Sequence, residues 1–247
     1  MLEIIDVTKH FGGFTALNRV SLKLEEGELR GLIGPNGSGK TTLFNVISGV
    51  LKPSSGVIKF LGHKISSLSP DQICHLGIAR TFQIPRPFRN MTLIENVMLG
   101  VMFGEGTKGK DDRNACEEAQ HFLLMVGLHA KDQATPNELT AAGLKRLELA
   151  RAIATKPDLL LADEFLSGLN REEIDQASNI LRKIRDEMGI TILWIEQIMS
   201  ALMNLVDRVT VLNYGEKIAE GTPQEVAANK DVIEAYLGKE TSDVATD

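Results

Sequence analysis

Residues 34–41 read Gly-Pro-Asn-Gly-Ser-Gly-Lys-Thr and match the pattern G-x-x-x-x-G-K-[ST] at every fixed position. Glycines let such a loop turn tightly and bring its backbone N–H groups against phosphate oxygens. Lys40 is long enough to reach β- and γ-phosphates, and the hydroxyl of Thr41 is placed to ligate Mg²⁺. The loop therefore predicts a site for a nucleoside triphosphate with Mg²⁺.

The residues on either side of the loop favour this interpretation over a chance glycine-rich turn. Leu29–Ile33 is a short apolar run typical of a strand, and Thr42–Ile47 continues as a helix. The N-terminus of that helix would face the phosphates, because its free N–H groups and its dipole favour negative charge. The residues predicted to bind the phosphates are Gly34, Pro35, Asn36, Gly37, Ser38, Gly39, Lys40, Thr41 and Thr42.

The composition restricts the class of protein. The chain has 247 residues, 43% hydrophobic and 24% charged, which fits one large globular domain or two closely joined lobes. A net charge of −6 without a run of like charges argues against nucleic acid as a main partner. Cys74 and Cys116 are far apart and lack a metal-like spacing, which favours a reducing compartment.

Apolar runs in the sequence are short. The N-terminus lacks the apolar core of a signal peptide, and no run approaches the ~18 residues that a membrane span needs. We therefore expect a soluble protein that works at a membrane only when another protein holds it there.

Several short segments have the pattern of strands. Residues 20–24 alternate between apolar and polar, and Val57–Leu61 follows a turn-rich stretch. These two segments predict an antiparallel sheet beside the phosphate-binding core. Val209–Leu212 and Lys217–Glu220 flank a Tyr-Gly-Glu turn and predict a hairpin.

Two compact apolar runs, Leu159–Ala162 and Ile190–Ile195, are typical of buried parallel strands. A helix is predicted between them, because apolar residues recur at spacings of three and four over residues 174–188. Asn170 begins a capping box at its start, and Gly189 stands where a C-cap glycine belongs. The alternation of strand and helix predicts an α/β fold.

The middle of the chain, residues 93–155, has a mostly helical pattern broken by a Gly- and charge-rich loop over Gly104–Asn114. His121–Val126 and Leu144–Ala154 have the pattern of amphipathic helices, so a helical lobe is predicted before the strand at Leu159. We expect one domain over residues 1–247, made of a β-lobe with the phosphate-binding core (1–84), the helical lobe (85–156), a continuation of the core (157–239) and a disordered tail (240–247).

The strand at Leu159 ends in two carboxylates, Asp163 and Glu164. Asp163 suits the coordination shell of Mg²⁺, which prefers carboxylate and water oxygens. Glu164 suits the orientation or deprotonation of an attacking water. An ordinary strand end with solvated acids would look the same in isolation, but the phosphate-binding loop upstream favours a catalytic pair.

Over almost its whole length the chain resembles the ATP-binding-cassette (ABC) ATPases, and most of all the ATPase subunits of importers for branched-chain amino acids, amides or urea. The resemblance lies in GLIGPNGSGKTTLFNVISGV (31–50), GIARTFQ (77–83), LTAAGLKRLELARA (139–152), LLLADE (159–164), SGLN (167–170), VLNYGEKIAEGTPQEV (211–226) and VIEAYLG (232–238). It implies a P-loop core with an antiparallel β-lobe and an inserted helical lobe, binding ATP and Mg²⁺.

The resemblance also implies roles for residues outside the loop. Gln83 matches the glutamine that touches Mg²⁺ or the attacking water and couples to the membrane subunit. Phe11 matches the aromatic residue that stacks on adenine. Phe11 could instead be a core residue, or Phe14 could take the stacking role. The implied metal ligands are Thr41, Gln83 and Asp163, and the implied catalytic residues are Lys40, Glu164 and Gln197.

A further implied segment binds the nucleotide of a second subunit. It is the family's signature, here Leu139, Thr140, Ala141, Ala142 and Gly143, and Arg151 stands at the expected distance of twelve positions. In the family this segment opens a helix whose positive end faces the γ-phosphate held by the partner. Ser167–Asn170 matches the loop that crosses the dimer interface.

The chain departs from the family in the signature. The common sequence is Leu-Ser-Gly-Gly-Gln, whereas Thr140 keeps the hydroxyl, Ala142 adds a Cβ, and Gly143 lacks the amide side chain. The ATP of the partner would then be held less tightly, although related importer subunits also vary here. Phe165 replaces the usual proline after the acidic pair and is expected to alter packing more than chemistry.

The sharper departure is Gln197, which follows Glu196 where the family has a histidine. A glutamine hydrogen-bonds to a phosphate oxygen or a water, but it cannot titrate or carry positive charge. One hypothesis is that ATP binding is retained while hydrolysis slows on the order of 10²-fold. The alternative is that glutamine substitutes fully.

The resemblance thus implies an ATP-hydrolysing subunit that powers a membrane importer. Its expected partners are a second ABC ATPase subunit, identical or related, transmembrane permease subunits and, indirectly, a solute-binding protein. Its expected place is the cytoplasmic face of the cell membrane. Alternatives are the ATPase of a lipopolysaccharide-type exporter, against which the altered signature argues, and an ATP-binding regulatory module with little turnover, against which Glu164 argues. An ATPase of DNA repair would carry a long coiled coil or a zinc motif, and the sequence has neither.

Overall fold

Two β-sheets carry the fold in the computed structural model, which describes residues 1–104, 112–129 and 133–237. The first sheet has four antiparallel strands in the order β2-β1-β4-β5. These are β1 (Leu2–Phe11), β2 (Phe14–Leu24), β4 (Ser55–Phe60) and β5 (His63–Lys64). The predicted antiparallel sheet is therefore confirmed, and the segment predicted as Val57–Leu61 begins and ends slightly earlier, at Ser55 and Phe60.

The second sheet has six strands in the order β10-β9-β3-β8-β7-β6. Its strands are β3 (Leu29–Ile33), β6 (Ile78–Arg80), β7 (Leu159–Asp163), β8 (Thr191–Ile195), β9 (Arg208–Asn213) and β10 (Glu216–Gly221). Neighbours from β9 to β6 pair in parallel, and β10 pairs antiparallel with β9 as the predicted hairpin. Every residue of β3, β7 and β8 is buried, which is why these segments are apolar throughout.

The helices are α1 (Lys40–Ile47), α2 (Pro70–His75), α3 (Leu93–Phe103), α4 (Asp112–Met125), α5 (Ala141–Ile153), α6 (Arg171–Met188), α7 (Met199–Met203), α8 (Pro223–Ala227) and α9 (Lys230–Leu237), with a 3₁₀ turn at Pro136–Glu138. The capping box at Asn170 and the left-handed Gly189 delimit α6 as predicted. The predicted loop over Gly104–Asn114 is wrong at its C-terminal end, because α4 begins at Asp112. The rest of that loop and the predicted tail at 240–247 lie outside the described residues.

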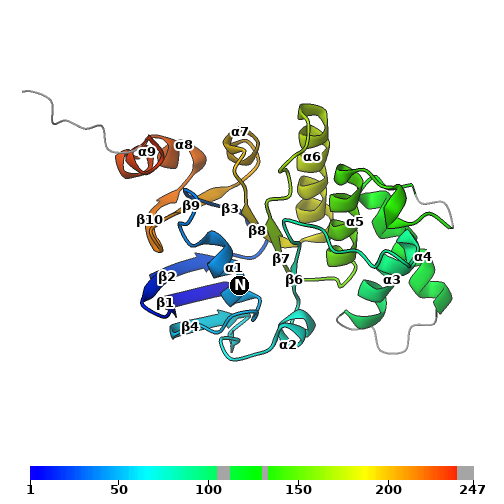
Figure 1. Ribbon diagram of the computed structural model, residues 1–247, viewed down its shortest axis with the longest axis horizontal. Coiled ribbons are helices and arrows are strands. Elements are labelled where there is room, and N and C mark those ends of the chain that lie inside the picture. Colours follow the sequence, from blue (N-terminus) through cyan, green and yellow to red (C-terminus); the bar gives the residue numbers. More distant parts are fainter. Residues whose placement is uncertain (105–111, 130–132, 238–247) are drawn as a thin grey trace, which may run out of the picture.

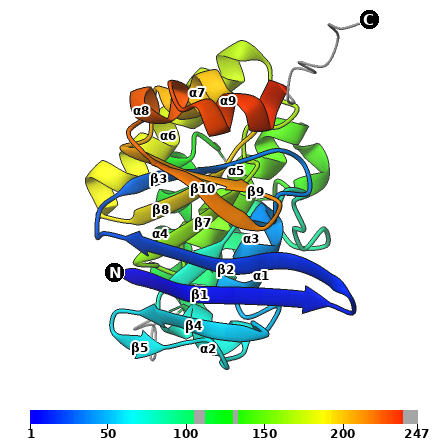
Figure 2. The same cartoon turned by 90° about the vertical axis from the view of Figure 1, so that its left-hand side faces the viewer.

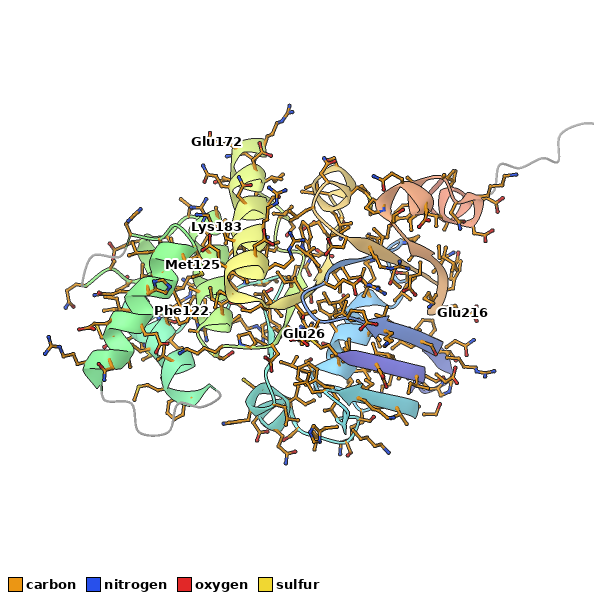
Figure 3. The ribbon with its side chains drawn as sticks, turned by 180° about the vertical axis from the view of Figure 1, so that it is seen from behind. Glu26, Phe122, Met125, Glu172, Lys183 and Glu216 are labelled. Atoms are coloured by element: carbon orange, nitrogen blue, oxygen red, sulfur yellow. The ribbon has the colours of Figure 1, made fainter. Side chains whose placement is uncertain are left out.

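The six-stranded sheet separates two hydrophobic cores. Side chains alternate across it, so that Leu160 and Trp194 face the core shared with α3 to α7, whereas Leu161 and Leu193 face α1 and the antiparallel sheet. Figure 1 shows α3, α4 and α5 grouped at one end, and Figure 2 shows the antiparallel sheet on the opposite side of the six-stranded sheet from α7, α8 and α9. In Figure 3, Phe122 of α4 and Glu216 of β10 mark the two opposite ends of the molecule.

None of the helices in the described part of the chain is both long enough and apolar enough to cross a membrane.

Candidate active site

The carboxyl ends of the parallel strands bring four distant segments to one edge of the six-stranded sheet. Strand β3 leads into residues 34–41, and β6 leads to Gln83. Strand β7 ends at Asp163 with Glu164 directly after it, and β8 leads to Gln197. Open parallel sheets bind ligands at this edge, so the strand order places the predicted site where such a fold holds a nucleotide.

The loop 34–41 has a backbone conformation that requires glycine at two places. Gly34 has a φ of +148°, and a Cβ on it would lie 2.0 Å from the carbonyl oxygen of Leu212. Gly39 has a φ of +104°, and its Cβ would lie 2.7 Å from the carbonyl oxygen of Ala16. A side chain at either position would strain the backbone and collide with a neighbouring strand or turn.

The start of α1 is open to an anion. Gly39 is its N-cap and provides no side-chain cap, and the first turn has no acidic residue. The hydroxyl of Ser38 is buried and has no hydrogen-bond partner among the described residues. Free backbone N–H groups and a spare hydroxyl fit the oxygens of a phosphate.

Lys40 lies across this loop. Its ammonium donates to the carbonyl oxygens of Gly34 at 2.6 Å and Pro35 at 3.0 Å. Burial lowers the pKa of Lys40, whereas the nearby Glu164 and Asp163 raise it. The two carboxylates thus only partly offset the lowering of the Lys40 pKa by burial, in favour of a cation close to the position where phosphate charge is predicted.

The carboxylate of Asp163 is held by an arginine that the sequence reasoning missed. Nη2 of Arg80 lies 2.8 Å from Oδ2 of Asp163, and Nη1 donates to Oδ1 of Asn45 at 2.7 Å. Burial raises the pKa of Asp163, and the hydrogen bond from Arg80 opposes that rise. A basic residue inside an apolar strand segment was the available signal, because such a residue is buried only with a partner.

The carboxylate of Glu164 accepts hydrogen bonds from both predicted amide side chains, those of Gln83 and Gln197. Nε2 of Gln197 donates to Oε1 of Glu164 at 2.7 Å, and Nε2 of Gln83 donates to Oε2. Glu164 is 8% exposed and has a φ of +46°, with its backbone N–H donating to the carbonyl oxygen of Ile195. An unusual backbone angle in a residue so placed is typical of functional sites.

The predicted Mg²⁺ ligands Thr41, Gln83 and Asp163 are all oxygen donors. Asp163 is a buried carboxylate with one oxygen on Arg80, and Thr41 is exposed in the first turn of α1. No group of three or more His, Cys, Asp or Glu side chains within the described ranges is arranged to hold a metal. A single carboxylate and a hydroxyl fit Mg²⁺, which takes its remaining ligands from phosphates and water.

The predicted signature segment opens a helix, as expected. Thr140 is the N-cap of α5, and its hydroxyl oxygen accepts a hydrogen bond from the N–H of Gly143 at 3.1 Å. Thr140 and Ala141 are exposed, whereas Ala142 and Gly143 are buried. No hydrogen bond among the described residues joins this segment to residues 34–42. The exposed part of residues 140–143 is therefore Thr140 and Ala141.

Phe11 and Phe14 face each other across the turn between β1 and β2. They are 46% and 64% exposed, which excludes the alternative that Phe11 is a core residue. The ammonium of Lys9 lies 5.2 Å from the centre of the Phe11 ring. Either ring is accessible to a flat base. In contrast, Phe165 is 3% exposed and part of the core, so its effect is on packing, as predicted.

The family model of the ABC transporter matches residues 17–167, and that of the branched-chain amino acid ATP-binding cassette transporter matches residues 216–241. The chain is 38% identical to the high-affinity branched-chain amino acid transport ATP-binding protein BraF of Pseudomonas aeruginosa, over 97% of this chain and 98% of BraF. It is also 38% identical to LivG of Escherichia coli, with the same coverage. These matches span nearly the whole of each protein.

Solved structures of ATP-binding cassettes have the same fold as this chain. A nucleotide-free ATP-binding cassette from an ABC transporter superposes with a TM-score of 0.85 at 31% identity, over 97% of this chain and 99% of that one. A dimeric cassette in a post-hydrolysis state, bound to ADP and Pi, superposes with a TM-score of 0.81 at 27% identity, over 90% and 99%. The chain belongs to the ABC transporter family, among the ATP-binding subunits of branched-chain amino acid transporters.

Proposed function

We propose that this chain binds and hydrolyses MgATP to power a membrane importer for branched-chain amino acids. The observation that carries the proposal is the meeting of residues 34–41, Asp163 and Glu164 at one sheet edge, with Glu164 bonded to Gln83 and Gln197. The cargo is proposed from the names of the relatives, which are branched-chain amino acid transport proteins over nearly their whole length.

Each group of site residues has its own role in the transfer of the γ-phosphoryl group to water. The N–H groups of residues 34–42 and the ammonium of Lys40 bind the phosphates. Thr41, Asp163 and Gln83 would hold Mg²⁺, which would supply positive charge to neutralise the charge that develops on the phosphates. Glu164 orients the attacking water and accepts its proton, and Phe11 stacks on the adenine.

Glu164 is oriented for that role, because each of its carboxylate oxygens accepts a hydrogen bond from a neighbouring side-chain amide. Each oxygen keeps a further lone pair that can accept a hydrogen bond from the attacking water. The hypothesis of slowed hydrolysis with retained ATP binding rests on the absence of a titratable group at position 197.

A second ATPase subunit completes the site. The exposed Thr140 and Ala141 at the start of α5 would meet the γ-phosphate bound by the partner, together with the rest of the segment 139–143. The first turn of α5 has no acidic residue that would repel that phosphate. The dimeric cassette among the similar structures supports this assembly.

A groove of about 350 Å³ offers a docking surface for a permease subunit. It lies between α2 and α5 and is lined in part by the segment that leads to Gln83. Its lining includes the apolar residues Ile73 and Phe82 and the charged residues Arg86 and Glu148. A helical loop of a permease seated there would contact both the helices of residues 85–156, which we assign to the helical lobe, and the residues next to Gln83. Attachment through permeases would hold the chain at the cytoplasmic face of the membrane, with a solute-binding protein acting only through them.

The first test is steady-state phosphate release from MgATP by the purified chain, with Glu164→Gln as the blank. Turnover above the blank supports an ATPase, and turnover equal to the blank together with tight ATP binding would instead favour a regulatory ATP-binding module. The cargo is tested by reconstitution with its permeases and binding protein, comparing the ATPase stimulation by leucine, isoleucine and valine with that by urea.

A further inference from the structure

Helix α5 carries two buried charged side chains that the proposed mechanism does not use. Lys145 is 8% exposed and Glu148 is 7% exposed, and they stand three positions apart on one helix. Charged side chains are rarely buried without partners, so their contacts indicate what they do. Both bind the backbone of other segments.

Lys145 holds the loop that follows β7. Its ammonium donates to the carbonyl oxygen of Ser167 at 2.5 Å, to the hydroxyl of Ser167 at 2.8 Å and to the carbonyl oxygen of Glu164 at 3.1 Å. An ammonium has three N–H donors, and all three are used on this loop. Burial lowers the pKa of Lys145, whereas the carboxylates of Glu196 and Glu164 raise it.

Glu148 holds the loop around Gln83. Its Oε1 accepts from the N–H of Phe82 at 3.2 Å, and its Oε2 accepts from the N–H of Arg86 at 2.9 Å. These two donors stand on either side of Gln83 in the sequence. The carboxylate thus spans the base of that loop.

The hydrogen bond between Gln83 and Glu164 joins the two loops and closes a ring. The ring runs from α5 through Lys145 to Glu164, then through Gln83 and its loop back to α5 at Glu148. A movement of α5 therefore shifts both loops, because a helix moves as a rigid element and each loop is attached to it by at least two hydrogen bonds.

We propose that Lys145 and Glu148 are positioning residues that transmit movement of the segment 139–143, at the start of α5, to the Gln83–Glu164 pair of the same subunit. This proposal rests on the proposed function, in which that segment contacts the ATP of the partner. Engagement of the partner's nucleotide would thereby adjust the carboxylate that acts on the subunit's own ATP.

The test compares Lys145→Met with Lys145→Arg and with a matched control, Arg146→Met. Arg146 is the next residue of the same helix, and it bonds to Gly127 and Gln176 instead of either loop. Three quantities are measured: the Kd for MgATP, the steady-state kcat, and the hydrogen exchange of the amides of residues 166–169 without nucleotide.

For Lys145→Met we expect kcat to fall roughly tenfold or more with the Kd within about threefold of the parent, and exchange at residues 166–169 to accelerate. Lys145→Arg should restore kcat and exchange, because its guanidinium can donate to the same carbonyls. Arg146→Met should change none of the three.

A second arm uses Glu148→Gln, which should accelerate exchange at the amides of Phe82 and Arg86 and lower kcat. In the double variant with Lys145→Met the losses of kcat should be less than multiplicative, since both act through one pair. Parent-like kcat in Lys145→Met, equal losses in Arg146→Met, or failure of Lys145→Arg to restore kcat would overturn the proposal.

If the parent itself shows no turnover, the proposed function fails first, and the exchange at residues 166–169 still decides whether Lys145 holds this loop.

Discussion

The side-chain amide of Gln197 donates a hydrogen bond to the carboxylate of Glu164, with 2.7 Å between Nε2 and Oε1. The side-chain amide of Gln83 donates to the other oxygen of Glu164. The proposed catalytic carboxylate therefore accepts hydrogen bonds from two neutral donors, which follow the strands on either side of β7. A histidine at position 197 could carry positive charge and exchange a proton, which an amide cannot. The slowed hydrolysis predicted for this site therefore rests on the lack of a titratable group beside Glu164.

Gln197→His should therefore raise the steady-state rate of phosphate release at least several-fold, because a titratable group replaces a fixed donor. Malachite-green or coupled-enzyme assays of the parent and the variant provide the comparison, with Glu164→Gln as the blank. A parent already well above the blank, with no gain from histidine, would show that Gln197 substitutes fully.

Gly34→Ala should abolish ATP binding and lower the free energy of unfolding by roughly 2 kcal/mol or more, since the new Cβ would lie 2.0 Å from a backbone oxygen in a left-handed conformation. Gly13→Ala is the matched control, because a Cβ there meets nothing within 4 Å and its φ is not in the left-handed region. Urea unfolding and titration with a fluorescent ATP analogue measure both effects. Equal behaviour of the two variants would contradict the strain argument.

Arg80→Met should destabilise the protein by about 3–5 kcal/mol, because it leaves the carboxylate of Asp163 buried without its partner. The double variant Arg80→Met/Asp163→Asn should recover part of that loss, since it removes the unpaired charge. Chemical denaturation of the three proteins without nucleotide tests this. A double variant that is less stable than Arg80→Met would show that the ion pair is not the source of the loss.

The free energy of unfolding should also depend on pH through Glu196, which is 1% exposed. Burial raises the pKa of Glu196, and hydrogen bonds from the N–H groups of Leu166, Gln197 and Ile198 only partly oppose this rise. The folded state therefore holds the proton of Glu196 more tightly than the unfolded state does. As a result, the contribution of Glu196 to stability falls as the pH rises above 4.5, the ordinary pKa of the group. The free energy of unfolding of the parent should fall relative to that of Glu196→Gln across this window. Parallel pH profiles for the two proteins would show that the pKa is not raised.

The fold was predictable because its signals are local. Apolar runs marked β3, β7 and β8, and the capping residues Asn170 and Gly189 marked both ends of α6. The start of α4 at Asp112 was not predictable in this way, because its first three residues, 112–114, are all polar.

The sequence by itself determined where the phosphate-binding motif and the acidic pair at 163 and 164 stand, because the spacing of a motif reflects backbone geometry within one segment. The resemblance to the ABC ATPases added the amides at 83 and 197 as candidates. Only the tertiary structure decided that both amides bind Glu164 and that Arg80 holds Asp163. It also decided that Lys145 and Glu148 attach α5 to the loop that follows β7 and to the loop around Gln83. Periodicity shows which face of a helix is buried, but not which backbone groups lie opposite it. Those contacts depend on the order of the parallel strands, which is set by packing between segments far apart in the chain.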